Sequence, residues 1–161
     1  MALRNIVKDG DDILNKKCRP VVKFDQKLRT LLDDMAETMH HAKGVGLAAP
    51  QVGILRRVVV IDVSAEQNEV LELVNPEIIA YSGEQEGLEG CLSFPGEWGI
   101  AKRPNYVKVR AQDRNGDEFE IEGRELLARA FCHEIDHLNG VVFKKKVERM
   151  LTPKEIEEMN N

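Results

Sequence analysis

The residues that decide the fold are ELLARAFCHEIDHLN, positions 125–139, which are followed by a glycine at position 140. Apolar side chains recur in this segment at the spacing of one helix face: Leu126, Leu127, Ala130, Phe131, Ile135 and Leu138. That period predicts an amphipathic helix, and Gly140 is typical of a helix end. We therefore expect a helix over 125–139 that buries its apolar side in the core.

This helix carries two histidines, His133 and His137, which stand four residues apart in the motif HEIDH. Residues at that spacing point to nearly the same side of a helix, so both imidazoles can bind one metal ion. Glu134 projects about 100° further round, where a general base for a metal-activated water belongs. The motif predicts a catalytic metal site; the alternative is a chance pair of helical histidines.

A catalytic metal usually has three protein ligands and one open position, so a third ligand is needed. No histidine follows His137. Of the downstream glutamates at 148, 155, 157 and 158, the last three fall on a predicted surface helix, so the downstream segment is a poor source of the ligand. Upstream, Cys91 lies in EGCLSFPG, positions 89–96, where glycine and proline let backbone approach a ligand. A thiolate with two imidazoles suits Zn(II), Fe(II) and related metals. This segment alone leaves a second interpretation open, in which Cys91 is a small buried hydrophobic residue.

A segment dense in small residues, GVGLAAPQVG, occupies positions 44–53. Its glycines let the backbone approach another group closely. Gln51 is its only polar side chain, and an amide in apolar surroundings needs a partner. Gln51 therefore either bonds the local backbone or donates a hydrogen bond to a substrate oxygen.

The remaining patterns predict a fold of the α+β class. Alternating or β-branched runs predict strands at 57–63, 70–75, 77–81, 106–112, 118–122 and 141–143. Asn115-Gly116 predicts a hairpin turn with positive φ at both central positions. A helix is predicted over 25–43, with Asp25 as its cap, and a short final helix begins at Thr152-Pro153. We expect antiparallel strands packed around one long central helix carrying HEIDH, plus the N-terminal helix and the short C-terminal helix.

The composition favours one globular domain spanning 1–161. The chain has 161 residues, of which 42% are hydrophobic and 32% charged, with a net charge of −5. No apolar stretch approaches the roughly 20 residues that span a bilayer, and the N-terminus lacks the apolar core of a signal peptide. The odd count of 3 cysteines argues against a disulfide framework and favours the reducing cytoplasm. Cys18 and Cys132 receive no function. The basic run 144–146 is too narrow for a nucleic-acid footprint.

Three segments together carry a family resemblance: GVGLAAPQ at 44–51, EGCLS at 89–93 and HEIDH at 133–137. In this order and at this spacing, they resemble the peptide deformylases. The resemblance covers nearly the whole chain, since residues 1–6 and 19–21 also look like the N-terminal part of that family.

The resemblance implies a role for each matching position. Cys91, His133 and His137 would hold the metal, with water as the fourth ligand. Glu134 would take a proton from that water and pass it to the leaving amine. Gln51 and the backbone N–H of Leu92 would bind the formyl oxygen as it becomes an oxyanion. The backbone of Gly46 would align the substrate, and the pocket for its first side chain would be bordered by Val45, Leu126, Arg129, Ala130 and the His133 ring.

The implied reaction is hydrolysis of N-formyl-methionyl nascent peptides to formate and a free N-terminus. Iron(II) is the metal usually associated with the family; zinc, nickel and cobalt are further candidates. Trp98 follows the cysteine motif and either lines the substrate cleft or is an exposed or half-packed aromatic residue. Some members dock on the ribosome through a long basic C-terminal extension, whereas this chain ends in an acidic segment that RNA phosphates would repel. Any ribosome association is therefore expected to be weak.

Two other classes of function compete with this interpretation. An HExxH metallopeptidase would share the helix and the base, but it would take its third ligand from elsewhere and keep its metal when Cys91 is replaced. A catalytically silent metal-binding homologue would have no need of Glu134, which this chain retains.

Overall fold

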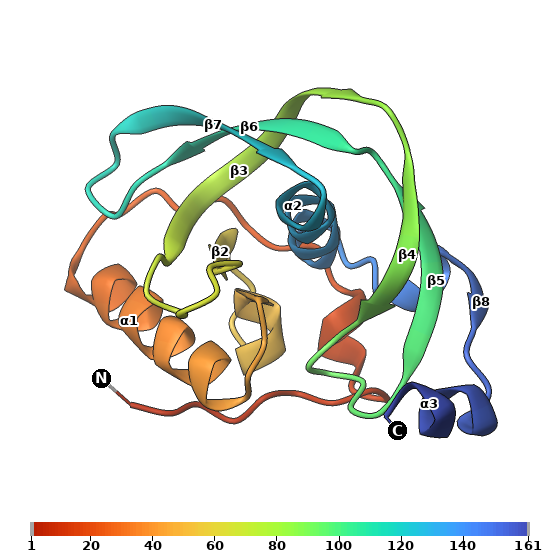
Figure 1. Ribbon diagram of the computed structural model, residues 1–161. Coiled ribbons are helices and arrows are strands. Elements are labelled where there is room, and N and C mark those ends of the chain that lie inside the picture. The colour runs from red at the N-terminus through yellow and green to blue at the C-terminus, as the bar shows by residue number, and fades with distance from the viewer. Residues whose placement is uncertain (1, 161) are drawn as a thin grey trace.

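The helix that carries HEIDH lies at the centre of the molecule, as Figure 1 shows for the computed structural model, which describes residues 2–160. This helix, α2, spans Leu126–Leu138 and is buried on almost every side. Strands curve over one side of it, a second sheet stands beside it, and helix α1 (Gln26–His41) lies on the opposite side of strand β2 (Val58–Ile61). The expected α+β architecture around a central helix is confirmed.

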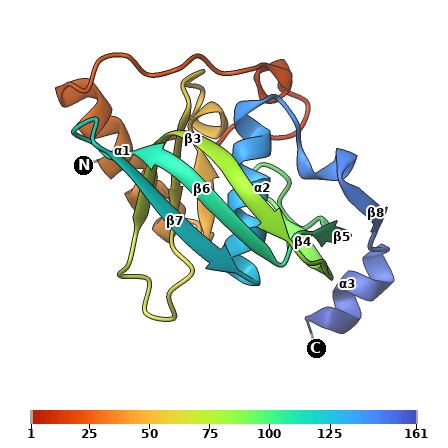
Figure 2. The same cartoon turned by 90° about the horizontal axis from the view of Figure 1, so that it is seen from above.

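Two antiparallel sheets enclose α2. The larger has the strand order β1-β2-β3-β6-β7, and its further members are β1 (Gly46–Ala48), β3 (Leu71–Ser82), β6 (Tyr106–Gln112) and β7 (Glu118–Arg124). The smaller has the order β4-β5-β8, with β4 (Gln85–Gly90), β5 (Trp98–Arg103) and β8 (Val147–Met150). Figure 2 shows β3, β6 and β7 running side by side across α2. β1 and β4 are edge strands of their sheets, and both border the site described below.

The core explains why β2 reads as an uninterrupted apolar run. Successive side chains of a strand point to opposite faces, and both faces of β2 are covered. Val59 and Ile61 pack in the same cluster as Phe131 of α2, whereas Val58 and Val60 pack in the cluster built on α1. β2 is therefore the layer that holds the two long helices apart.

The short elements follow local capping rules. Asp25 caps α1 by accepting a hydrogen bond from the N–H of Leu28. Thr152 and Glu155 form a capping box at the start of α3 (Pro153–Met159), as predicted. Short 3₁₀ helices lie at Asp12–Asn15, Ala49–Val52 and Phe143–Lys145. Among residues 2–160, the structure has no helix with the length and apolar character needed to cross a membrane.

Three local predictions are wrong. The strands expected at 70–75 and 77–81 form one strand, β3, because Asn75 adopts φ 51° and makes a bulge that keeps the strand continuous. The Asn75 side chain fixes this bulge through hydrogen bonds with the backbone of Val21, of 2.8 and 2.9 Å. The segment 141–143 is not a strand, because Phe143 begins a 3₁₀ helix. The ring of Phe143 packs on the ring of Phe94. At the hairpin, Gly116 has positive φ and Asn115 does not.

Candidate metal centre and substrate pocket

Two distant parts of the sequence contribute three side chains that together could hold a metal ion. His133 and His137 project from α2, and Cys91 follows directly after the end of β4. One ligand atom from each of the three residues lies within 4.8 Å of the others, and the Cys91 sulfur is 3.3 Å from Nε2 of His137. The structure therefore gathers the predicted Cys/His/His set at one point.

The surroundings of these side chains fit a transition metal. Nδ1 of His133 lies 2.8 Å from a carboxylate oxygen of Glu89, which leaves Nε2 of that ring free as a ligand. His137 is fully buried, and its Nδ1 has no hydrogen-bond partner among the described residues. Metal–ligand bonds of roughly 2.0–2.3 Å separate neighbouring ligand atoms by distances of the same order as those seen here. One soft thiolate with two imidazoles suits first-row metals such as iron and zinc.

The two histidines differ in proton affinity. Burial alone would lower the pKa of His133, but the neighbouring Glu134 carboxylate and the bonds to Cys91 and Glu89 raise it well above its ordinary value. Burial lowers the pKa of His137 well below the ordinary value, and the nearby charge of His133 lowers it further. A metal that binds both rings therefore displaces a proton, so its affinity falls as the pH falls.

Glu89 is the residue that sequence reasoning missed. Its buried carboxylate accepts hydrogen bonds from Arg103 at 3.0 and 2.6 Å and from Arg129 at 3.0 Å, in addition to its contact with His133. Burial would raise the pKa of this carboxyl, but these partners, His133 and Arg103 foremost, hold it well below its usual range. The signal in the sequence was a charged residue two positions before the ligand Cys91, in a segment that becomes a buried strand end.

Arg103 connects this network to the second carboxylate of the HEIDH motif. Its Nη1 donates to Asp136 at 2.8 Å, while its Nε and Nη2 hold Glu89. Arg103 lies on β5 and Asp136 on α2, so one buried guanidinium connects the smaller sheet to the metal helix. Asp136 is thus linked through Arg103 to the Glu89 carboxylate that contacts His133.

Glu134 is in the opposite electrostatic situation. Its side chain is buried, and Oε1 has no hydrogen-bond partner among residues 2–160. Burial raises the pKa of this carboxyl from 4.5 to about 7. A Cβ atom at Gly46 would lie 2.5 Å from Oε2 of Glu134, so any larger residue at position 46 would push the carboxylate aside. The result is a carboxyl group poised to gain or lose a proton near neutral pH.

Gln51 bonds the local backbone through its oxygen and turns its amide nitrogen toward the site. Its Oε1 accepts a hydrogen bond of 3.0 Å from the N–H of Ala48. Its Nε2 points to the site, 3.4 Å from the Cys91 sulfur and 3.2 Å from the hydroxyl oxygen of Ser93. The local backbone therefore fixes the amide so that its N–H₂ group faces the metal ligands.

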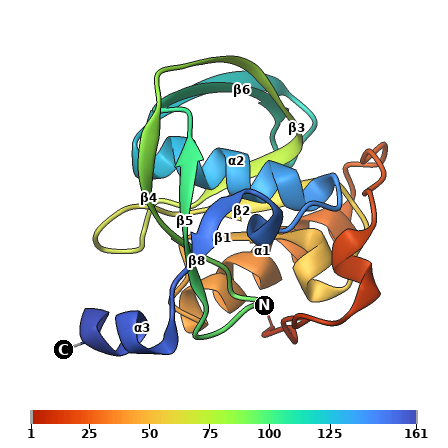
Figure 3. The same cartoon turned by 90° about the vertical axis from the view of Figure 1, so that its right-hand side faces the viewer.

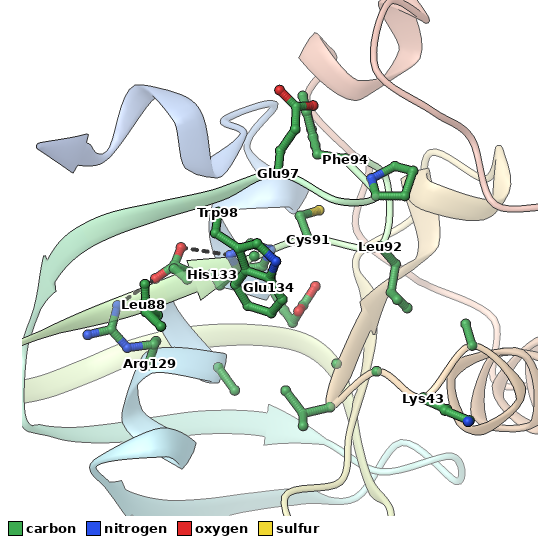
Figure 4. A pocket seen from close by; sticks show the side chains of 18 of the residues that line it. Lys43, Leu88, Cys91, Leu92, Phe94, Glu97, Trp98, Arg129, His133 and Glu134 are labelled. Atoms are coloured by element: carbon green, nitrogen blue, oxygen red, sulfur yellow. Dashed lines mark hydrogen bonds and ion pairs between the residues drawn. The ribbon is translucent and has the colours of Figure 1, made fainter. Parts of the chain in front are cut away.

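A pocket of about 470 Å³ opens in front of these groups, and Figure 4 shows its lining. It includes every predicted catalytic and substrate-binding residue: Val45, Gly46, Gln51, Leu92, Leu126, Arg129, Ala130 and Glu134. His133 and Cys91 also line it. Trp98, from the first position of β5, stands in front of His133 and Glu134 as part of the wall (Figure 4). Val45 and Leu126 are 41% and 48% exposed, so they form its rim.

A cysteine and two helical histidines beside a buried, proton-accepting carboxylate define a metal-dependent hydrolase. A family model described as polypeptide deformylase matches residues 3–152. The peptide deformylase of Lachnoclostridium phytofermentans is 61% identical over 147 residues, which cover 91% of this chain and 90% of the relative. The crystal structure of a peptide deformylase from Legionella pneumophila aligns with a TM-score of 0.87 at 44% identity, covering 98% of this chain and 91% of that one.

A second crystal structure, of peptide deformylase from Thermotoga maritima, aligns with a TM-score of 0.87 at 41% identity and covers 91% of this chain and 99% of that one. The chain therefore belongs to the polypeptide deformylase family. It is an enzyme of the metal-dependent class that removes N-terminal formyl groups.

Proposed function

We propose that residues 1–161 form one catalytic domain that hydrolyses N-formyl-methionyl nascent polypeptides to formate and a free N-terminal methionine. The observation that carries this proposal is the cluster of Cys91, His133 and His137, two of which line one pocket together with Glu134. Oε1 of that glutamate has no hydrogen-bond partner among residues 2–160. Membership of the deformylase family supports the reaction type.

Cys91, His133 and His137 would hold one divalent metal, with iron(II) as our first candidate and zinc, nickel or cobalt as alternatives. A bound metal of this kind lowers the pKa of a bound water molecule and polarises a carbonyl oxygen. Glu89 would fix the His133 ring through Nδ1, so that Nε2 keeps its direction toward the metal.

Glu134 would act as the general base and then as the general acid. Burial raises the pKa of this carboxyl, which suits a group that accepts a proton from water and returns it to the departing amine. Its free oxygen has no protein partner among the described residues, so no hydrogen bond has to break before the proton moves.

The amide of Gln51 and the backbone N–H of Leu92 would stabilise the negative charge that develops on the formyl oxygen. The Gln51 amide is held in place by Ala48 and Ser93 before substrate arrives, which is the preorganisation such a donor needs. The backbone of Gly46 would align the peptide. The methionine side chain would lie among Val45, Leu126, Arg129, Ala130 and the His133 ring, all at the same pocket.

The close approach of Gly46 to Glu134 supports selection of a formyl group. The backbone of β1 lies directly against the carboxylate, so little width remains beside the reacting carbon for a larger acyl group. A methyl group in that place, as in an acetylated peptide, would meet backbone on one side and Glu134 on the other.

We place this activity in the cytoplasm, where formylated nascent chains are made, with no membrane or sequence-specific nucleic-acid partner. Ribosome docking through the C-terminus would be weak, because α3 carries Glu155, Glu157 and Glu158 near its exposed end.

Formate release from N-formyl-Met-Ala-Ser, measured with anaerobically purified protein of known metal content, tests the proposal. We expect release in proportion to bound metal, and none from the N-acetyl analogue. A fully metal-loaded protein that releases no formate would overturn the assignment. Cleavage of an internal peptide bond, with metal retained in Cys91→Ala, would instead identify an HExxH metallopeptidase.

A further inference from the structure

A second groove lies on the outer side of the loop that joins β4 to β5. It is lined by Gly96 and Glu97 of that loop, by Met150 and Leu151 at the end of β8, and by Pro153 and Ile156 of α3. Figures 1 and 3 both show α3 standing beside this loop, away from the central helix. Because Met150, Leu151 and Ile156 are each partly exposed, the groove presents an apolar floor to solvent.

This outer groove adjoins the main pocket across the loop that joins β4 to β5. Gly96 and Glu97 line both of them, so the loop forms a low wall with the metal centre on one side and α3 on the other. Loop residues Phe94 to Trp98 border the main pocket on the same side. An extended chain advances about 3.3–3.6 Å per residue, so a polypeptide leaving the main pocket over this wall needs few residues to reach α3.

The wall itself is held in place by Lys144. Its ammonium group lies 2.7 Å from Glu97 and 3.4 Å from Asp9, and it stands 4.9 Å from the centre of the Phe94 ring. Among the described residues that line the outer groove, Glu97 alone is charged, and Lys144 pairs with it. The groove is therefore suited to an apolar side chain and not to a charged one.

We propose that this outer groove is an accessory binding site for the downstream part of the formylated polypeptide, occupied by an apolar side chain beyond the first three residues. The inference rests on the proposed deformylase function, and it adds α3 and the end of β8 to the surface that recognises substrate. Short peptides do not reach this site, whereas a nascent chain does. Burial of one apolar side chain there lowers the KM of a long substrate about tenfold relative to a short one.

The test compares three substrates: N-formyl-Met-Ala-Ser, an N-formyl decapeptide with the same first residues and leucines at positions four to eight, and a matched decapeptide with serines there. For the wild-type metalloenzyme we expect the leucine decapeptide to have a KM about tenfold below the other two, with similar kcat. Ile156→Asp, in α3, and Leu151→Gln, between β8 and α3, should each abolish that difference and leave the tripeptide unchanged. Met159→Asp, on the same helix but outside the groove, is the control and should keep it.

Equal KM values for the two decapeptides in the wild type would overturn the accessory site, as would an undiminished leucine preference in both groove variants. Leu151→Gln keeps the test decisive if Ile156→Asp detaches α3, since Leu151 lies outside that helix. If even the tripeptide yields no formate, the proposed function fails, which is a different result from activity without a length preference.

Discussion

Two buried glutamates on opposite sides of His133 have opposite electrostatic environments. Glu89, behind the ring, is held by Arg103, Arg129 and the His133 imidazole. Glu134, in front of it, has a carboxylate oxygen without a hydrogen-bond partner among residues 2–160. The pKa of Glu89 lies well below its usual range, whereas that of Glu134 is raised by burial to about 7. Equal burial thus gives one fixed anion and one proton carrier, and the difference is the set of cationic partners.

The comparison separates two kinds of role. A carboxylate that is saturated with hydrogen bonds cannot exchange protons near neutral pH, so Glu89 can position the metal ligand but cannot act as a base. A carboxylate left without partners destabilises the folded protein when it is charged, and it persists where reactivity requires it.

Replacing Glu134 should have the largest effect. In Glu134→Gln we expect kcat to fall by about 10²–10⁴-fold, the usual contribution of a general acid–base, because the amide cannot accept the proton. Metal content should be unchanged, since the Cys91, His133 and His137 set remains. Formate release together with metal analysis measures both, and a variant with wild-type kcat would remove Glu134 from the mechanism.

The same variant should stabilise the metal-free fold. The folded pKa of Glu134 lies at about 7, above the ordinary 4.5, so the folded protein binds this proton more tightly than the unfolded chain. The stability that protonation of this group contributes is therefore fully present below pH 4.5 and is lost as the pH rises toward 7. At pH 8, the free energy of unfolding of metal-free Glu134→Gln should exceed that of the metal-free wild type by about 3 kcal/mol. At pH 4 the two free energies should differ little.

Urea unfolding in chelator at both pH values measures this difference. Glu157→Gln, an exposed residue of α3, is the control and should show no such pH dependence. Equal stability of wild type and Glu134→Gln at pH 8 would mean that the buried carboxylate has a partner or remains protonated.

Replacing Glu89 should weaken metal binding without removing the base. Glu89→Gln keeps the shape but not the charge that pairs with Arg103, Arg129 and the His133 ring, so the ring loses its fixed direction. Loss of such a partner typically lowers metal affinity by about 10–100-fold. Competition with a chromophoric chelator gives the affinity, and Glu134→Gln serves as the matched buried variant with normal affinity. Unaltered metal affinity in Glu89→Gln would show that His133 binds the metal equally well without the carboxylate at its Nδ1.

The smallest effect is expected at an exposed charge cluster. Arg110 of β6 contacts Glu77, Glu118 and Glu120 at 3.3, 3.1 and 3.7 Å, a set of partners as large as that of Glu89. The side chains of Arg110 and Glu77 are 43% and 65% exposed, so water screens the charges. Arg110→Ala should change the free energy of unfolding by less than about 1 kcal/mol and leave activity intact. A loss of several kcal/mol would show that the number of partners matters more than burial.

The elements that sequence predicted well are those whose signal is local. The 3.6-residue period of 125–139, the caps at Asp25 and Thr152, and the alternation in 106–112 each report a regular element directly. β1, β4, β5 and β8 were not predicted. β4 and β5 contain glycines and charged residues, and their strand form depends on pairing with each other, which no local pattern records.

The sequence by itself determined the helix over 125–139 and the common side from which His133 and His137 project. It also carried the family resemblance that identified Cys91, Gln51 and Leu92 as candidate site residues. The tertiary structure decided which carboxylates are reactive, because the pKa of a buried group depends on partners that arrive from other elements. Arg103 reaches Glu89 across a strand pair and Asp136 across to α2, whereas Oε1 of Glu134 has no hydrogen-bond partner among residues 2–160. Folding alone brings such residues together, so their roles follow from the structure and not from their order in the chain.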